Sequence, residues 1–390
     1  MSDDNLKGDL FYSLLLINKV INGPWIKKMI QKERLSRLSE LYLYQKDFLN
    51  EHDLTSDQFD LWKKFTRTDP YRRFSEYVEY TENKGIHSCD ILDDVYPECL
   101  KVFPNMPVVL YYKGDMSLLD KNHSRVSIVG TRRPSSYGRR VTRDFSGNLA
   151  RHDIVIVSGL ARGIDGIAHM ACLESGGKTI AVLPCGLDIC YPQEHLELCR
   201  EAARTGLVIS ELAPGQQPIR QYFPARNRIL SAVADCVLIV EAGQNSGTLH
   251  TASFAAAQGK EVFTIPSIIY SDTAKGNLSL MKDGATVATE PEDILAYLAN
   301  VVFFREIDEI KESYERQKLE KKIKEDPESL QSSEIRYVIC DLLTSCELSL
   351  DEIVKASGIP YLSIVSELGK MELEGKITKE RQKYILTIRF

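Results

Sequence analysis

The chain has 390 residues, of which 43% are apolar and 27% charged, and its formal net charge is −6. This composition excludes a disordered or collagen-like chain, and the length predicts two or three domains. No apolar run is long enough to span a membrane and no secretory signal is visible, so we expect a cytoplasmic protein that does not contact membranes. The nine cysteines include no Cys-x-x-Cys motif and the histidines lack ligand spacing, which favours reduced thiols and predicts no metal site.

The first part of the chain is expected to be helical. From about residue 8 to residue 80, apolar residues recur every three or four positions without strand-like alternation, which predicts a small helical (SAM-like) domain over residues 1–82. Between residues 85 and 114 the pattern changes to three short stretches that we interpret as a β-rich lead-in to the next domain.

Strands and helices then alternate through the middle of the chain. Strands are expected at residues 126–129, 154–157, 179–183, 207–210, 237–241 and 262–265, and helices at 139–150, 164–174, 194–204, 227–234 and 249–258. Nearly continuous apolar strands separated by helices predict a parallel sheet that is covered on both faces. The fold class is therefore α/β, with a Rossmann-like domain over residues 83–300 and ligands beyond the carboxyl ends of the strands.

The last ninety residues predict two further segments. Charged residues dominate residues 301–333, as in a solvated helical linker. Residues 334–390 predict three helices and a hairpin, the order of a winged helix. The third helix carries Glu367, Glu372 and Glu374 against Lys370 and Lys376. The helix thus carries too little positive charge to favour entry into a DNA groove. Contact with a protein or packing against another domain is therefore the favoured role of residues 334–390.

The loop after the first central strand has the residues of an anion site. Gly130 lets the backbone approach a ligand closely, and Arg132 presents a planar fork to phosphate oxygens. Residues 125–143 contain six arginines and no acidic residue, although the chain as a whole is acidic. A nucleic acid responds to such a local patch and not to the total charge.

Three more loops follow strands in the same domain. In the second, Gly159 and Gly163 flank Arg162, while Asp165 is expected to cap the next helix and His169 to be structural.

In the third loop, aromatic residues stand beside Arg226 and Arg228, within a stretch from residue 212 to 234 that contains no acidic residue. Aromatic and arginine side chains side by side are typical of single-strand binding. A position for Phe223 in the hydrophobic core remains open. In the fourth, Ser246 and Gly247 precede a helix whose N-terminus suits a phosphate, and Lys275 could close the rim.

Five ordered motifs across these loops resemble the DNA-processing protein A (Smf) family. They are Gly-Thr-Arg…Ser-x-Tyr-Gly, Ser-Gly-x-Ala-x-Gly-Ile-Asp…Ala-His, Gly-Leu-Asp-x-x-Tyr-Pro, Phe-Pro-x-Arg-Asn-Arg, and Val-Glu-Ala…Ser-Gly-Thr. The helical head and the winged-helix tail are also similar to the longer members of that family.

The resemblance implies a protein that binds single-stranded DNA without evident sequence choice, forms a homodimer, protects incoming strands and loads the RecA recombinase during natural transformation. It implies no catalytic residue and no cofactor. Carried over motif by motif, the phosphate-facing positions are Gly130, Thr131, Arg132, Gly159, Arg162, Gly163, Phe223, Arg226, Arg228, Ser246 and Gly247. Two positions depart from the family pattern, His195 after the Tyr-Pro motif and Ser267 after the last strand.

Two other functions remain open. One is a phosphoribohydrolase that acts on nucleoside monophosphates, but the loop around Thr248 lacks the carboxylate that such an enzyme would use as its acid or base. The other is a nucleotide sensor that uses the same arginines. A nucleotide needs one phosphate site, whereas a strand needs several along a groove.

Overall fold

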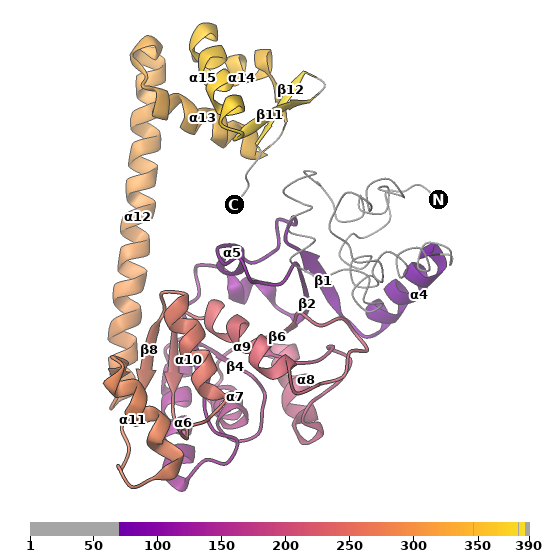
Figure 1. Ribbon diagram of the computed structural model, residues 1–390, viewed down its shortest axis with the longest axis vertical. Helices are drawn as coiled ribbons and strands as arrows, with labels where there is room; N and C mark the ends of the chain where they lie inside the picture. The colour runs from indigo at the N-terminus through magenta and orange to yellow at the C-terminus, as the bar shows by residue number, and fades with distance from the viewer. Residues whose placement is uncertain (1–69, 346, 381, 387–390) are drawn as a thin grey trace. The chain divides into compact units, whose positions relative to one another are not determined.

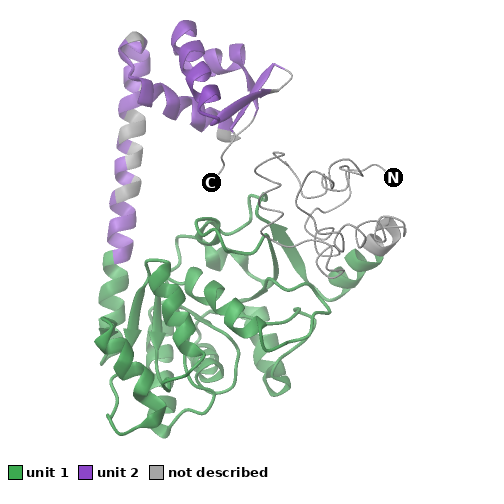
Figure 2. Ribbon diagram, in the orientation of Figure 1, with its two compact units in different colours: residues 1–30, 35–300 green, residues 31–34, 301–390 purple. Residues whose placement is uncertain are grey.

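The computed structural model describes residues 70–345, 347–380 and 382–386 (Figure 1). The described chain separates into two compact units, of which the first ends at Asn300 and the second continues from Val301 (Figure 2). The helices predicted before residue 70 lie outside the described residues, and the first described element is helix α4 (Pro70–Asn83). None of the described helices is both long and apolar enough to cross a membrane.

The first unit is built on one large sheet, which has nine strands in the described residues. The strands are β1 (His87–Asp90), β2 (Val109–Gly114), β3 (Arg125–Val129), β4 (Val155–Ser158), β5 (Thr179–Val182), β6 (Leu207–Ser210), β7 (Cys236–Ile239), β8 (Glu261–Thr264) and β9 (Thr286–Val287). Their order is β1-β2-β6-β5-β4-β3-β7-β8-β9. All neighbours from β6 to β9 pair in parallel, whereas β1 and β2 add an antiparallel edge.

Helices lie between these strands as the alternating pattern predicts, and one more follows β9. They are α5 (Glu98–Lys101), α6 (Ser136–Arg151), α7 (Ile164–Glu174), α8 (Leu196–Thr205), α9 (Tyr222–Ala232), α10 (Thr248–Ala257), α11 (Lys275–Lys282) and α12 (Pro291–Glu325). The predicted α/β class with a mostly parallel central sheet is confirmed.

Two local expectations are wrong. Residues 98–101 form a short helix within the stretch that we expected to be β-rich. Helix α9 begins at Tyr222 rather than at residue 227, so the stretch with Phe223 and Arg226 is a first helical turn and not a loop. Pro224 fits there because the N–H groups of a first turn have no partner within the helix.

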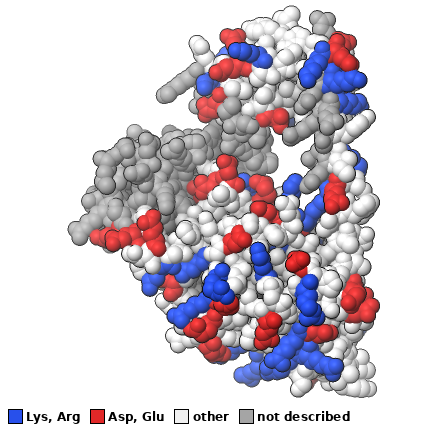
Figure 3. Space-filling model, turned by 180° about the vertical axis from the view of Figure 1, so that it is seen from behind, with Lys and Arg blue, Asp and Glu red and all other residues white. Residues whose placement is uncertain are grey.

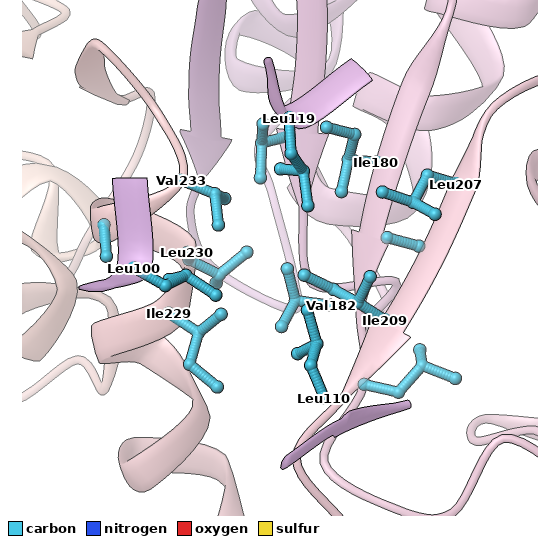
Figure 4. Close-up of a cluster of buried hydrophobic side chains, with 14 of the residues drawn as sticks. Leu100, Leu110, Leu119, Ile180, Val182, Leu207, Ile209, Ile229, Leu230 and Val233 are labelled. Atoms are coloured by element: carbon cyan, nitrogen blue, oxygen red, sulfur yellow. The ribbon is translucent and has the colours of Figure 1, made fainter. Parts of the chain in front are cut away.

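Apolar side chains from alternating strand positions fill both faces of the sheet. On one face Val126 and Ile128 pack with Phe145 and Leu149 of α6. On the other face the side chains of β5 and β6 meet those of α9 and of the segments around Leu100 and Leu110 (Figure 4). Because both faces are covered, the positions of the strand ends, and of the loops that follow them, are fixed by the core.

The second unit contains the end of α12 and a small helical and β-structured region. It comprises α13 (Ser332–Ser345), β10 (Leu348–Ser349), α14 (Leu350–Ser357), α15 (Tyr361–Leu373), β11 (Ile377–Glu380) and β12 (Lys383–Leu386). The three helices and the hairpin occur in the predicted order, and β10 pairs with β12 as a further strand. The winged-helix assignment of this unit stays a prediction.

Candidate nucleic-acid interface

The candidate site lies where the direction of the chain through the sheet reverses. From β3 the chain moves outward through β4, β5 and β6, and then returns to β7 on the other side of β3. Strands β4, β3 and β7 are therefore neighbours, and the loops after them meet at the carboxyl edge of the sheet. In open parallel sheets such a reversal point is where ligands bind.

A pocket of about 350 Å³ occupies this place. It is lined by Val129, Gly130, Thr131, Arg132, Ala161, Asp165, Phe223, Pro224, Arg226, Asn227, Leu230, Ser246, Gly247, Thr248 and Thr251. A second hollow of about 590 Å³, which we call the groove, is lined by Arg132, Tyr191, Pro218, Arg220, Phe223, Pro224, Asn245, Gly247 and His250. The pocket and the groove share four of these residues and so adjoin each other, which gives a site longer than a single phosphate.

Three side chains form the wall between pocket and groove. The guanidinium carbon of Arg132 lies 4.9 Å from the centre of the Phe223 ring. The Phe223 ring meets that of Tyr191 edge-on, with their centres 5.5 Å apart. Phe223 is only half-buried, so it belongs to this wall and not to the hydrophobic core. Stacked rings beside a guanidinium can hold bases and a phosphate backbone together.

The N-terminus of α10 lies on the same side of the pocket. Gly247 is its N-cap residue and makes no side-chain cap, and the Ser246 hydroxyl accepts a hydrogen bond from the Thr248 N–H at 3.2 Å. The next two N–H groups donate to the carbonyls of Ser246 and Gly247, so this helix end attracts an anion mainly through the positive end of the helix dipole. Ser246 and Gly247 both line the pocket, as the sequence predicts for a phosphate site.

Arg226 lines the pocket but is buried, with only 5% of its surface exposed. Its guanidinium donates to the Gly159 carbonyl at 2.8 Å and also to the Val182 carbonyl. Burial lowers the pKa of Arg226 to about 10, and the nearby Asp165 carboxylate opposes that shift. Arg226 therefore ties α9 to the ends of β4 and β5, which is a positioning role that the sequence did not reveal.

Asp165 does not cap α7, contrary to the expectation from the sequence. The N-cap is Gly163, and the buried Asp165 carboxylate accepts backbone N–H bonds from Gly130, Gly159 and Ala161. Burial raises the pKa of Asp165, while Arg226 and these backbone donors act against the shift. The carboxylate thus fastens the loops after β3 and β4 to each other.

Glu241 fixes the Gly-Thr-Arg loop from the other side, and the sequence analysis did not include it among the site residues. Its carbonyl accepts from the Thr131 N–H at 2.7 Å, and its carboxylate accepts from both the N–H and the hydroxyl of Ser135. Ser135 in turn caps α6 by accepting from the Gly138 N–H. The only sequence signal for this role is the Val-Glu-Ala motif that follows β7.

The glycines of the second loop allow close packing of backbone segments. A Cβ atom on Gly159 would lie 2.3 Å from a guanidinium nitrogen of Arg226. Gly163 has a φ of +79°, and a Cβ there would lie 2.3 Å from the Thr131 carbonyl oxygen. Neither lines the pocket, so in this structure both glycines make room for protein atoms.

Three predicted phosphate ligands are ion-paired and line neither the pocket nor the groove. Arg162 forms two hydrogen bonds to Glu194, at 2.5 and 2.7 Å. Arg228 pairs with Glu211 at 2.5 Å, and Lys275 pairs with Asp272 at 2.6 Å. The paired carboxylate offsets the positive charge that each of them would present to a phosphate.

The comparison with protein families decides where the chain belongs. Residues 87–299, more than half of its length, match the family described as DNA recombination-mediator protein A. The chain belongs to that family. The resemblance inferred from the five motifs is thereby confirmed.

Curated relatives and solved structures agree with this assignment. DNA processing protein DprA of Bacillus subtilis (strain 168) is 38% identical over 228 residues, 58% of this chain and 76% of that protein. DNA processing protein DprA of Streptococcus pneumoniae (strain R6) is 42% identical over 209 residues, 54% of this chain and 73% of that protein.

Two structures of family members superimpose on the chain. The X-ray structure of DNA processing protein A from Streptococcus pneumoniae has a TM-score of 0.64 at 33% identity, covering 74% of this chain and 97% of the other. A structure of DNA processing protein A from Helicobacter pylori, which describes a unique single-stranded DNA binding mode, has a TM-score of 0.50 at 32% identity and covers 55% of this chain and 96% of that one.

The two departures from the family pattern lie beside the site. The His195 ring is 2.9 Å from the Leu160 carbonyl, so its Nδ1 donates and braces the loop after β4. Ser267 follows β8, next to Pro266, whose carbonyl accepts from the Tyr137 hydroxyl at 3.1 Å. The groove also contains Arg220, which the sequence places with the arginines of the third loop. Tyr191 was not among the predicted site positions, although it belongs to the Gly-Leu-Asp-x-x-Tyr-Pro motif.

Proposed function

We propose that the chain binds single-stranded DNA, without preference for sequence, in the pocket and the groove. The observation that carries this proposal is the wall of Arg132, Phe223 and Tyr191 beside the N-terminus of α10. The arrangement offers a guanidinium and the positive end of a helix dipole to phosphates, and ring faces to bases, along more than one nucleotide. The likeness to the Helicobacter pylori protein, which binds single-stranded DNA, supports the proposal.

The predicted site residues divide into two proposed roles. Gly130, Thr131, Arg132, Phe223, Ser246 and Gly247 line the pocket and are proposed to contact DNA. Gly159, Gly163 and Arg226 are proposed to position those contacts. Arg162, Arg228 and Lys275 are held by carboxylates, so we propose that they bind phosphate only where DNA displaces those partners.

The test is fluorescence anisotropy of labelled oligothymidylate over a salt series. The log of the affinity is expected to fall with log salt by about 0.7 for each phosphate contact. Arg132→Ala should weaken binding and flatten this slope. Arg200→Ala is a matched control, because Arg200 is an exposed arginine on α8 that pairs with Glu197 at 2.6 Å. Equal slopes for Arg132→Ala and the wild type would contradict the proposal.

A nucleoside monophosphate is the alternative ligand, because the pocket alone is large enough for a small molecule. Hydrolysis by this pocket has no evident agent, since Asp165 is the only acid among its lining residues and that carboxylate already accepts three backbone N–H bonds. Monophosphates and duplex DNA should therefore compete poorly with the oligothymidylate. Efficient displacement by a monophosphate would favour a nucleotide sensor.

We further propose that the chain protects incoming strands and loads a RecA-type recombinase during DNA uptake, acting as a homodimer. This rests on the family. The domain assignments, a SAM-like helical domain over residues 1–82 and a winged helix over residues 334–390 that serves protein contact or domain packing, stay predictions from the sequence. The test is recombinase filament assembly on a strand already covered by single-strand-binding protein. Assembly should be faster with the chain present, and sedimentation should give twice the monomer mass.

A further inference from the structure

Helix α6 carries a row of exposed arginines. Arg139, Arg140, Arg143 and Arg151 are all exposed, and within the part of the chain that the structure describes none of them is within 4 Å of a carboxylate oxygen. The exposed arginines of α8 differ, because Arg200 and Arg204 pair with Glu197 and Glu201 three residues away. The charge on α6 is therefore available to an external anion.

The spacing places most of this charge on one side of the helix. Arg140, Arg143, Gly147 and Arg151 follow one another by three or four residues, so they share a face. This face lines a shallow basin of about 410 Å³ formed by Arg140, Arg143, Asp144, Gly147 and Arg151 of α6 and by Ala171, Glu174 and Ser175 of α7. The basin holds three cations against two acids, and the buried Gly147 lets α6 pack closely against Ser175 at its floor.

The arginines continue directly from the candidate site. Arg132 in the pocket wall and Arg133 stand in the loop that leads into α6 at Ser136. From Arg139 to Arg151 the helix rises by about 18 Å, twelve residues at about 1.5 Å each. Lys and Arg side chains gather over the lower part of the first unit on the face that Figure 3 shows, where α6 lies.

The chemistry of this face fits a phosphate backbone better than a protein. Protein interfaces have an apolar centre, whereas the only large hydrophobic residue exposed on α6 is Tyr137 at its start. Guanidinium groups in a row contact phosphates without reading bases. We propose that α6 and its basin form a second contact surface for DNA, along which a strand held in the groove continues. This inference rests on the proposed function.

The experiment compares two oligothymidylates, one of about 6 nucleotides that fills only the groove and one of about 30 that can reach α6. The variant is Arg140→Ala/Arg143→Ala/Arg151→Ala, and the matched control is Arg200→Ala/Arg204→Ala. The α6 variant should bind the long oligothymidylate more weakly than the wild type does. The slope of its log affinity against log salt should be smaller by about 2, because three phosphate contacts at about 0.7 each are lost. The α6 variant should bind the short oligothymidylate like the wild type, and the control variant should bind both lengths like the wild type.

Several outcomes would overturn the proposal. The long oligothymidylate could bind the α6 variant with wild-type affinity and slope, or both lengths could lose affinity equally. The variant could also keep its DNA binding and lose only a protein partner, which would make α6 a protein surface. If the wild type bound neither length, the proposed function would fail first. Alanine favours helix, so the variant should fold, and thermal unfolding together with a glutamine version of the same three positions checks this.

Discussion

The Arg132 guanidinium lies over the Phe223 ring, 4.9 Å from its centre, and so joins the loop after β3 to the first turn of α9. Neither side chain is buried, so each can exchange its contact with the other for a contact with a ligand. The Phe223 ring also packs edge-on against Tyr191, so two neighbouring side chains restrict its orientation. Such preorganisation lowers the entropy cost of binding.

Phe223→Ala is therefore expected to weaken binding of single-stranded DNA by about 1–3 kcal/mol, the usual range for loss of one stacked base. The Phe223 ring lines the pocket and the groove and is not part of the hydrophobic core. The temperature midpoint of unfolding of the variant should therefore differ little from that of the wild type. Anisotropy titration and thermal unfolding together check both parts.

Phe303→Ala is the matched control, since Phe303 is an aromatic residue on α12 with 55% of its surface exposed. This control should leave DNA affinity unchanged. A Phe223→Ala protein that unfolds much more easily would show that the ring is a core residue after all.

Arg226 is expected to matter for stability before it matters for DNA. Arg226→Met removes the donor to Gly159 and Val182 and leaves the Asp165 carboxylate buried without its cation. Each buried carbonyl that loses its donor costs about 1–3 kcal/mol, and the loss of the nearby positive charge further destabilises the buried carboxylate. Urea denaturation should show a lower free energy of unfolding of this order, whereas Arg132→Ala should unfold like the wild type. A stable Arg226→Met protein with weak DNA binding would instead make Arg226 a direct ligand.

The sequence predicts the sheet and the edge at which the pocket lies, because both depend on local patterns. Buried strands such as β6 are visible as runs of apolar residues, and amphipathic helices such as α6 as apolar residues at every fourth position. The glycines and arginines after strands mark the carboxyl edge of the sheet. For that reason the loops with Arg132 and Gly247 were expected together, and the pocket contains both.

The partners of the arginines could not be predicted in the same way. The stretch from residue 212 to 234 contains no acid, which indicated free arginines. The carboxylate that pairs with Arg228 belongs to Glu211, just before the stretch, and Arg226 is held by the Gly159 and Val182 carbonyls at the ends of two other strands. Such contacts form only in the tertiary fold, because the partners come from different parts of the sequence. No local sequence pattern predicts them.

The stability of the first unit should fall as the pH drops below about 6.5 because of His169. This histidine is fully buried, its Nδ1 donates to the Thr179 hydroxyl at 2.6 Å, and burial lowers its pKa from 6.5 to about 3. Between these values the unfolded chain binds a proton that the folded chain excludes. The free energy of unfolding therefore decreases by up to about 1.4 kcal/mol per pH unit as pH falls through this window.

Urea denaturation of the wild type and of His169→Gln between about pH 7 and pH 5 checks this assignment, since an unshifted histidine would titrate in that range. The variant is less stable at every pH, but its free energy of unfolding should depend less on pH. Parallel curves for the two proteins would mean that other groups cause the acid sensitivity.

Cys190 is expected to be the more reactive of two neighbouring thiols near the site. Cys190 and Cys199 are both half-buried, and a hydrogen bond between their side chains lowers the pKa of Cys190 and raises that of Cys199. The thiolate is the nucleophile, so alkylation by iodoacetamide should modify Cys190 first and should begin at a lower pH than for an ordinary cysteine. Peptide mass spectrometry over a pH series identifies the modified residue. In Cys190→Ser the Cys199 thiol loses the neighbour that raises its pKa, so its alkylation should speed up; modification of Cys199 before Cys190 in the wild type would reverse the assignment.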